Sequence, residues 1–413
     1  MKRVLPLLIL IVSFIAGYRI ISIWQGVHLY QKDITKERLL KATRLTSFNP
    51  DPYYRLGILY QWDIRNLDLK QSLHYFEQAI ERNPIEQEYW LNAARSFQRT
   101  GKDGPFRHAL ENAVRVYPTS FQGRWVAGNL LLQQGDLEGA IPQFSYILSN
   151  HPDRSLMVYN VWMNVARSPE FILERLVPRD SASLRRFLAY LYQLGDKVTA
   201  KKTWEKKMAL GERMNRDEAL HHIDFLVSQG ELHEAFRVWK KRLQEENLPV
   251  LYGGNLVTNS GFEKEEVLGG GFDWKIQTVP GALISFDRSV AFEGKGSLKI
   301  VFNGKENVDF QHVSQVVALK PNTDYLLTAY VKTKGVTTKS GVKIEISGVG
   351  VPFHAGSESL IGDNGWKELV VPFHTPPQSQ GGVVRLRREP TEKFDRFISG
   401  LVWVDNFRLT EKK

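Results

Sequence analysis

The chain contains no cysteine among its 413 residues. Disulfide bonds and thiolate metal sites are therefore excluded, whereas no cellular compartment is. The sequence also lacks the G-x-S-x-G, H-E-x-x-H and phosphate-loop motifs of hydrolases, zinc proteases and nucleotide-binding proteins. No paired acidic motif typical of a glycosidase stands out either. We therefore predict that the protein is not an enzyme.

Long runs of basic residues are missing too, although the formal net charge is +10. An excess of this size can serve nucleic acid, anionic lipid or an acidic polymer. Because no nucleic-acid-binding motif accompanies the charge, we interpret it as a basic, solvated surface. We expect no nucleic-acid partner.

What the sequence does contain is a repeat of 34 residues. Prolines recur at this interval, and two glycines between them keep the same spacing. These residues are Pro50, Pro84, Pro118 and Pro152, with Gly101 and Gly135 between them. The interval equals one helix–turn–helix unit of a stacked solenoid. Such arrays offer a long concave surface, so the pattern indicates binding rather than catalysis.

The clearest units are Gln87–Pro118 and Phe121–Pro152. Small residues at Ala94 and Gly128 let the paired helices approach closely, and Phe144 fills the gap to a neighbouring unit. These segments resemble tetratricopeptide repeats, whose pattern places a small residue, an aromatic, a turn glycine, an alanine and a closing proline at these offsets. The resemblance implies an α-solenoid that binds a protein partner.

Further units extend the array over residues 33–247. Tyr53–Pro84 fits the pattern with a longer turn, Asp63–Leu69. Residues 153–180 contain Pro169 and Pro178 and are interpreted as a divergent unit. Two later units lack the closing proline but share a spacing of 35 residues at the pairs Gly195/Gly230, Ala200/Ala235 and Trp204/Trp239.

The N-terminus has the composition of a targeting segment, because Lys2 and Arg3 precede a mostly apolar stretch. Val4–Trp24 covers 21 residues, enough to cross a bilayer as a helix. No A-x-A cleavage site follows, and Arg19 can reach the interface. We expect residues 1–32 to form a signal-anchor; a cleaved signal peptide and a buried soluble helix are the alternatives.

The composition changes near Leu248–Gly254, and residues 248–413 are expected to form an all-β domain. Short segments with period-two apolar alternation are separated by turn residues, as in a β-sandwich. The expected strands are Leu298–Phe302, His312–Leu319, Tyr325–Val331, Val342–Ile346, Glu368–Phe373, Val383–Leu386 and Leu401–Leu409.

The motifs along this region resemble those of the jelly-roll carbohydrate-binding modules of bacterial cellulases and xylanases, part of the galactose-binding-like group. The region opens with Asn255-Leu-Val-x-Asn-x-Gly-Phe-Glu263, continues with Glu293-Gly-Lys-Gly-Ser297, and closes with Trp403-Val-Asp-Asn-Phe-x-Leu409. The resemblance implies an antiparallel jelly roll and, in many members, one structural calcium ion. The matching positions are Glu263, Glu293 and Asp405, which otherwise are ordinary turn carboxylates.

Glycan binding, which the resemblance also implies, needs exposed aromatic rings beside polar groups. The candidates are Trp274, Phe310, Gln311, His312, Gln315, Phe353, His354 and Arg387. Core positions are the alternative, especially for Trp274, and we expect Trp366 and Trp403 to lie in the core. The adjacent pair His221 and His222 points to different sides of a helix and makes a poor metal site.

The expected architecture is a transmembrane helix, an α-solenoid and a C-terminal β-sandwich. We predict a single-pass bacterial inner-membrane protein whose bulk is periplasmic. It would be an adaptor in surface polysaccharide assembly or export, binding a protein through its repeats and a glycan through its sandwich. The alternative is a structural scaffold of an envelope complex without glycan binding. The step to polysaccharide rests on the combination of domains alone.

Overall fold

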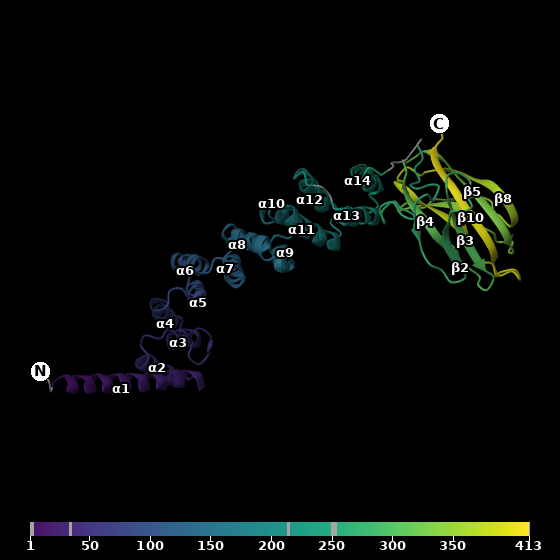
Figure 1. The fold of residues 1–413 in the computed structure, drawn as a ribbon. Coiled ribbons are helices and arrows are strands. Elements are labelled where there is room, and N and C mark those ends of the chain that lie inside the picture. The colour runs from purple at the N-terminus through teal and green to yellow at the C-terminus, as the bar shows by residue number, and fades with distance from the viewer. Residues whose placement is uncertain (1–3, 33–34, 213–214, 249–253, 413) are drawn as a thin grey trace. The chain divides into compact units, whose positions relative to one another are not determined.

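The computed structural model describes residues 4–32, 35–212, 215–248 and 254–412. Lys2 and Arg3, the expected positively charged start, lie outside these ranges. The chain divides into two compact units. The first comprises residues 1–191 and 202–207, and the second comprises residues 192–201 and 208–413. Figure 1 shows helices followed by a two-layered β domain.

The first helix, α1 (Val4–Lys32), has two parts with different surroundings. Large apolar side chains between Leu8 and Ile21 are exposed, and Leu8–Gln31 is long and apolar enough to cross a membrane, a property that signal sequences share. The last turns instead pack against α2 (Lys36–Leu45), where a Cβ on Gly26 would lie 2.4 Å from the Thr46 side chain. The helix therefore continues from an exposed apolar segment directly into the repeat core.

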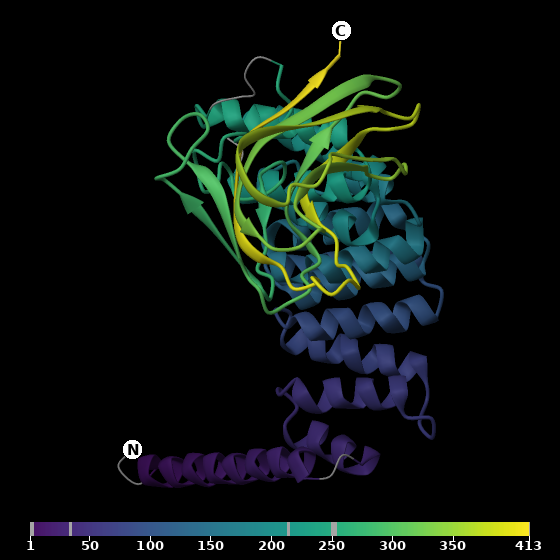
Figure 2. The same ribbon diagram turned by 90° about the vertical axis from the view of Figure 1, so that its right-hand side faces the viewer.

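The helices that follow form successive antiparallel pairs, and Figure 2 shows the first of these pairs side by side. They are α3 (Asp51–Trp62), α4 (Leu69–Arg82), α5 (Gln87–Arg99), α6 (Asp103–Val116), α7 (Phe121–Gln133), α8 (Leu137–Asn150), η1 (Pro152–Arg154), α9 (Ser155–Ala166), α10 (Pro169–Arg175), α11 (Ser181–Leu194), α12 (Lys197–Ala209), α13 (Arg216–Ser228) and α14 (Leu232–Glu245). The divergent unit expected at residues 153–180 contains a 3₁₀ turn and the short helix α10.

Local signals in the sequence explain where these helices begin and end. Asp68, Ser120 and Asp136 are N-caps whose side chains accept hydrogen bonds from the first-turn backbone N–H groups. Gly101 and Gly135 adopt positive φ at the turns within the pairs, as the repeat pattern requires. Each pair then buries one apolar face against its neighbours.

The C-terminal domain is a sandwich of two five-stranded antiparallel sheets. We call them sheet A, with the order β1-β4-β9-β6-β7, and sheet B, with the order β2-β3-β10-β5-β8. The strands are β1 (Lys275–Ile276), β2 (Ala282–Asp287), β3 (Ser297–Asn303), β4 (Phe310–Ala318), β5 (Asp324–Val336), β6 (Lys343–Gly348), β7 (His354–Gly356), β8 (Gly362–His374), β9 (Gly381–Arg388) and β10 (Ser399–Glu411). All seven strands expected from the alternation are present.

Alternation along the strands fills the space between the sheets with apolar side chains. Ile344 and Ile346 from sheet A and Val402 and Val404 from sheet B are fully buried there. Arg388 is also fully buried, and its guanidinium donates to the Val308, Arg396 and Ser340 carbonyls and to the Asn307 side chain. Four hydrogen bonds thus offset much of the cost of burying this charge.

The sandwich is tied to the last helix pair within the second unit. Phe272 is 1% exposed, and its ring lies 5.1 Å from that of Phe236 and 6.1 Å from that of Trp239. Both partners belong to α14. The glycine run Gly269–Gly271, which lacks the strand and helix context of a phosphate loop, brings this loop close to the helices.

Candidate functional site

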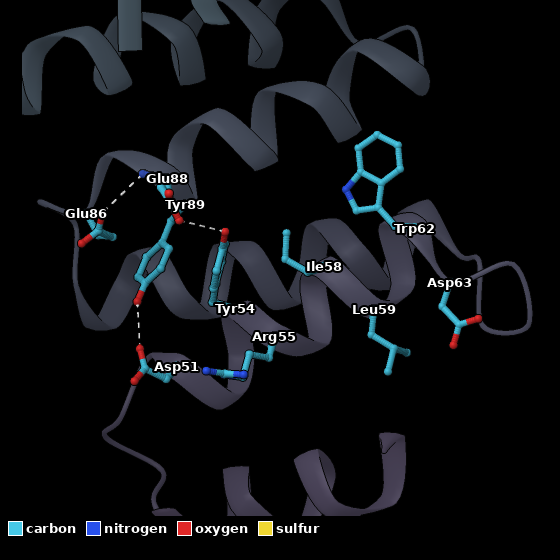
Figure 3. A pocket seen from close by; sticks show the side chains of 10 residues that line it. All are labelled: Asp51, Tyr54, Arg55, Ile58, Leu59, Trp62, Asp63, Glu86, Glu88 and Tyr89. Atoms are coloured by element: carbon cyan, nitrogen blue, oxygen red, sulfur yellow. Dashed lines mark hydrogen bonds between the residues drawn. The ribbon is translucent and has the colours of Figure 1, made fainter. Parts of the chain in front are cut away.

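A groove opens between α3 and α5, the first helices of two successive repeats (Figure 3). Its volume is about 860 Å³. Four carboxylates, one arginine, three aromatic residues and two aliphatic residues line it: Asp51, Asp63, Glu86, Glu88, Arg55, Tyr54, Tyr89, Trp62, Ile58 and Leu59. The groove is therefore acidic and apolar in a chain whose net charge is +10.

Hydrogen bonds hold the aromatic side of this groove in place. The Tyr54 hydroxyl donates to Glu88 at 3.2 Å, and the Tyr89 hydroxyl donates to Asp51 at 3.4 Å. The two rings lie 4.8 Å apart. Burial and the adjacent carboxylates raise the pKa of both tyrosines, so they stay protonated donors at neutral pH. At the other end Trp62 is 59% exposed and can contact a bound chain, with the Arg99 guanidinium 5.6 Å from the centre of its ring.

A second candidate is the outer face of sheet A, where polar side chains alternate with the buried core residues. Glu345 on β6 is 3% exposed, and one of its oxygens lies 3.5 Å from Arg385 and 3.9 Å from Arg387. Its other oxygen lies 3.9 Å from the His354 ring and has no hydrogen-bond donor among the residues that the structure describes. Arg385 also donates to Ser347 at 2.9 Å. This set can donate to and accept from sugar hydroxyls.

The structure brings only part of the expected glycan set to this face. Arg387 and His354 flank Glu345, and Arg387 also contacts Asp309. Phe353 is half-buried with its ring stacked on Phe373 at 5.8 Å. Gln311 and His312 lie on β4, the first exposed and the second half-buried.

Three of the residues expected to bind a glycan point into the core instead. Trp274 is 8% exposed and packs against Phe262 and Phe407, and Phe310 is fully buried. Neither ring can offer a face to a sugar. Gln315 is 1% exposed, and its side-chain amide exchanges two hydrogen bonds with the Thr258 backbone. Both Gln315 polar atoms are thus used within the protein.

An aromatic group that sequence reasoning missed lies on the outer face of sheet B. Phe292 is 40% exposed and stacks on Tyr330 at 3.5 Å, with Trp366 edge-on at 5.9 Å. Beside it, Lys332 lies over the ring of Trp403. Trp366 is only half-buried, so our core assignment for it was wrong. Trp403 is 7% exposed, but it lies on the outer face beneath Lys299 and Lys332 and not among the core residues Val402 and Val404. We call Phe292, Tyr330 and Trp366 the aromatic platform.

The three carboxylates expected to hold calcium come from segments that meet at one end of the sandwich. Asp405 is buried, and one of its oxygens accepts the N–H groups of Phe292 and Glu293 at 2.7 and 3.1 Å. Glu263 accepts from the Lys295 N–H at 2.8 Å, and Glu293 accepts from the Asn406 amide at 2.8 Å. A β-bulge at Asp405 and the left-handed backbone of Asn406 aim the Asp405 carboxylate at this turn.

Within this cluster, opposing effects act on the pKa of Asp405. Burial raises the pKa of Asp405, and the nearby Glu263 carboxylate adds to the shift against the effect of the backbone hydrogen bonds. The donor set is all oxygen, which suits a hard cation such as calcium. In the described ranges, however, no group of three His, Cys, Asp or Glu side chains is arranged closely enough to hold a metal ion. A cation would therefore need backbone oxygens or a shift of Glu293.

His222, set aside as a metal ligand, is a core residue. It is 1% exposed, and its ring nitrogen lies 2.8 Å from the Tyr192 hydroxyl. Burial lowers its pKa to about 3. The ring is thus neutral at physiological pH and ties α13 to α11.

Comparisons with known proteins match part of the helical region and most of the C-terminal domain. A model described as carbohydrate binding domain matches residues 254–393, and a tetratricopeptide repeat model matches residues 107–155. A search for related sequences among curated proteins finds no match.

Several solved structures align with parts of this chain. The CBM22-1 xylan-binding domain of Paenibacillus barcinonensis Xyn10C is 16% identical and aligns with 40% of this chain and 99% of its own, at a TM-score of 0.29. A structure titled Family 16 Carbohydrate Binding Module-2 is 24% identical over 38% of this chain and 100% of its own, at 0.27. Pseudomonas aeruginosa pilF is 15% identical over 56% of this chain and 92% of its own, at 0.27.

The family matches and the sheet topology agree with both resemblances found in the sequence. The chain thus combines tetratricopeptide repeats in its helical region with a C-terminal sandwich like those of carbohydrate-binding modules.

Proposed function

We propose that the protein is a non-enzymatic, membrane-anchored adaptor of the bacterial envelope that joins a protein partner to a glycan. Repeats of this type serve protein interaction, and domains of the C-terminal type serve carbohydrate binding. The observation that carries the proposal is the groove between α3 and α5. A structural scaffold without glycan binding remains the alternative.

The lining of the groove defines the chemistry of the protein partner. Glu86 and Glu88 can pair with lysine or arginine, while Trp62 and Ile58 can cover apolar side chains. The partner segment is therefore basic with interspersed apolar residues. Such a segment is attracted by the carboxylates and anchored by the aromatic rings, which supply most of the affinity in peptide grooves.

A photo-crosslinking side chain at Trp62, in cells of the source organism, tests the groove. We expect an adduct with one defined protein, lost when Glu86 and Glu88 are replaced by glutamine. A matched control carries the crosslinker at Leu156, which is 53% exposed and lies outside the groove. Equal yields of the same adduct from Trp62 and Leu156 would contradict a groove-specific partner.

For the glycan, the aromatic platform supplies what the outer face of sheet A lacks. Sugar rings stack on aromatic faces through their C–H groups, and Phe292 and Trp366 are accessible on sheet B. Lys332 and Lys299 lie over the Trp403 ring beside it; Lys299 is also paired with Asp287 at 3.6 Å, so Lys332 is the main source of positive charge there. An acidic polysaccharide matches this combination, in keeping with a role in surface polysaccharide assembly or export.

We further propose that α1 stays attached as the anchor and that the rest of the chain is periplasmic. The exposed apolar side chains from Leu8 to Ile21 support this, since in water they would be unfavourably solvated. Reporter fusions after Leu248 test the orientation. A fusion active only in the cytoplasm would contradict it, and a mature chain starting near residue 18–25 would replace the anchor by a signal peptide.

A further inference from the structure

We propose that one edge of the first repeats rests on the surface of the lipid bilayer beside α1. The edge consists of the turns between helix pairs, and the inference rests on the membrane anchoring proposed above. Exposed apolar side chains occupy three successive turns: Phe48, Ile85 and Tyr117 are 59%, 77% and 58% exposed. We call these three residues the turn edge.

Direct contacts show that these turns are neighbours. Because consecutive helices run antiparallel, every turn between pairs lies on the same side of the stack. The Arg82 side chain donates to the Ser47 carbonyl at 2.6 Å, which joins the first turn to the second. The Gln87 amide donates to the Tyr117 carbonyl at 3.3 Å, which joins the second to the third. The three turns therefore form one continuous rim of the repeat stack, and the turn edge is the exposed apolar part of this rim.

Helix α1 leaves the repeats across this same rim. Gly26 lies against Thr46, and the Asn49 amide donates to the Tyr30 hydroxyl at 3.1 Å, so the first turn is packed on α1. Ser22 is 9% exposed, whereas the large apolar side chains from Leu8 to Ile21 are exposed. The helix thus emerges from the repeat core near Ser22 and continues beyond the rim.

The length of the emerging segment sets the level of the bilayer. Residues 4–21 of α1 span about 27 Å at 1.5 Å per residue, close to the roughly 30 Å of a hydrocarbon core. The hydrocarbon therefore ends near Ser22, about one helical turn before Gly26 and about two before Tyr30, the α1 residues that contact the turn carrying Phe48. Trp24 is 65% exposed at this level, where interfacial aromatic residues gather. Arg19 lies close enough to reach the headgroups.

Charge alone does not explain this contact, because both signs occur near the rim. Arg44 and Arg115 are exposed there, and so is Glu81, with Glu86 half-buried. Burial of Phe48 and Ile85 in the headgroup region is the favourable term. The groove then begins at the bilayer, since Asp51 and Glu86 lie at one end of it and Trp62 and Asp63 at the other (Figure 3). It would receive a partner segment adjoining the membrane.

The absence of native cysteine allows a direct test with single-cysteine variants of the full chain in lipid nanodiscs. An environment-sensitive NBD label would be placed at Phe48→Cys and Ile85→Cys. The matched control is Ile64→Cys in the α3–α4 turn, on the opposite edge, where the isoleucine is 92% exposed. Leu10→Cys on α1 reports the anchoring itself. Emission wavelength and quenching by headgroup-proximal spin-labelled lipids are measured for each.

We expect labels at Phe48 and Ile85 to show blue-shifted emission and strong quenching, while the label at Ile64 behaves as in water. If Leu10 is in lipid but Ile85 matches Ile64, the rim contact is overturned and the anchoring stands. If Leu10 also matches Ile64, the anchoring fails, and this inference fails with it. In detergent-solubilised protein, the difference in emission between the labels at Ile85 and Ile64 should disappear if the rim meets a planar bilayer. A difference that persists in detergent would assign the blue shift to contacts within the protein.

Discussion

The ring of Phe144 occupies the space where Gly128 has no side chain: a Cβ at residue 128 would lie 2.6 Å from the ring. The two residues face each other across α7 and α8, and Phe144 is fully buried. Trp125 and Trp162 pack edge-on against the same ring, each with its ring centre 5.7 Å from that of Phe144. The repeat motif therefore depends on this glycine for close helix packing rather than for a turn.

Replacing Gly128 with leucine should destabilise the repeats, because the aromatic ring has no room to move. We expect a loss of about 1–3 kcal/mol in the free energy of unfolding, typical of overpacking. Urea unfolding of the full chain in detergent measures it. Gly104→Leu is the control, since a Cβ there meets nothing within 4 Å. Equal stability of the two variants would show that the Gly128–Phe144 contact is not tight.

Calcium should stabilise the sandwich by relieving repulsion between Glu263 and Asp405. A cation that binds only the folded state adds about 2.7 kcal/mol at a hundredfold excess over its dissociation constant. We expect a higher melting temperature in millimolar calcium than in chelator. Asp405→Ala should abolish the difference, and Glu358→Ala, which removes an exposed carboxylate elsewhere, should keep it. Superimposable melting curves for the unmodified protein would eliminate the metal site.

In chelator, Asp405 should also affect the pH dependence of stability. Its folded pKa is raised, so the folded state holds this proton more tightly than the unfolded state. The resulting stabilisation is present below the unfolded pKa and is lost as pH rises through the folded pKa. The unmodified protein should therefore gain stability relative to Asp405→Ala on acidification, as followed by melting temperature. The opposite trend would mean that the backbone hydrogen bonds dominate.

Buried His222 should make the helical region acid-sensitive. Its folded pKa is about 3, so the unfolded state takes up the proton first as pH falls below about 6.5. Stability is then lost by about 1.4 kcal/mol per pH unit between these values, or about 2 kcal/mol at pH 5. His222→Gln should remove that loss, whereas exposed His374→Gln should not. Urea unfolding at pH 7 and pH 5 would reveal whether the two variants differ.

The sequence was sufficient to predict the repeats and the strands because both depend on local periodicity. Prolines and glycines at a fixed interval mark turns, and alternation in segments such as Leu401–Leu409 marks strands. Contacts between distant segments were less accessible. The stacking of Phe292 on Tyr330 joins a loop to β5, and no local pattern contains that information.

The candidate glycan residues show the same limit more sharply. Trp274 and Phe310 were selected for residue type, yet the sandwich needs their bulk between its sheets. Glu345 and Arg385, which the sequence analysis did not select, alternate with core residues on their strands, but that alternation does not show which residues lie beside each other. Only the register of β6 against β9, which pairs Glu345 with Arg385, brings the two together.

Glycan binding separates the adaptor from a scaffold most directly. The measurement is calorimetric titration of the purified protein with a panel of neutral and acidic soluble polysaccharides. Trp366→Ala is compared with Val370→Ala, a change on the same strand at a side chain that is 46% exposed. Loss of a stacking residue typically costs about 1–3 kcal/mol, so we predict binding of an acidic polysaccharide that Trp366→Ala weakens about tenfold or more and Val370→Ala leaves intact. The absence of binding to every member, or binding unaffected by Trp366→Ala, would contradict the account.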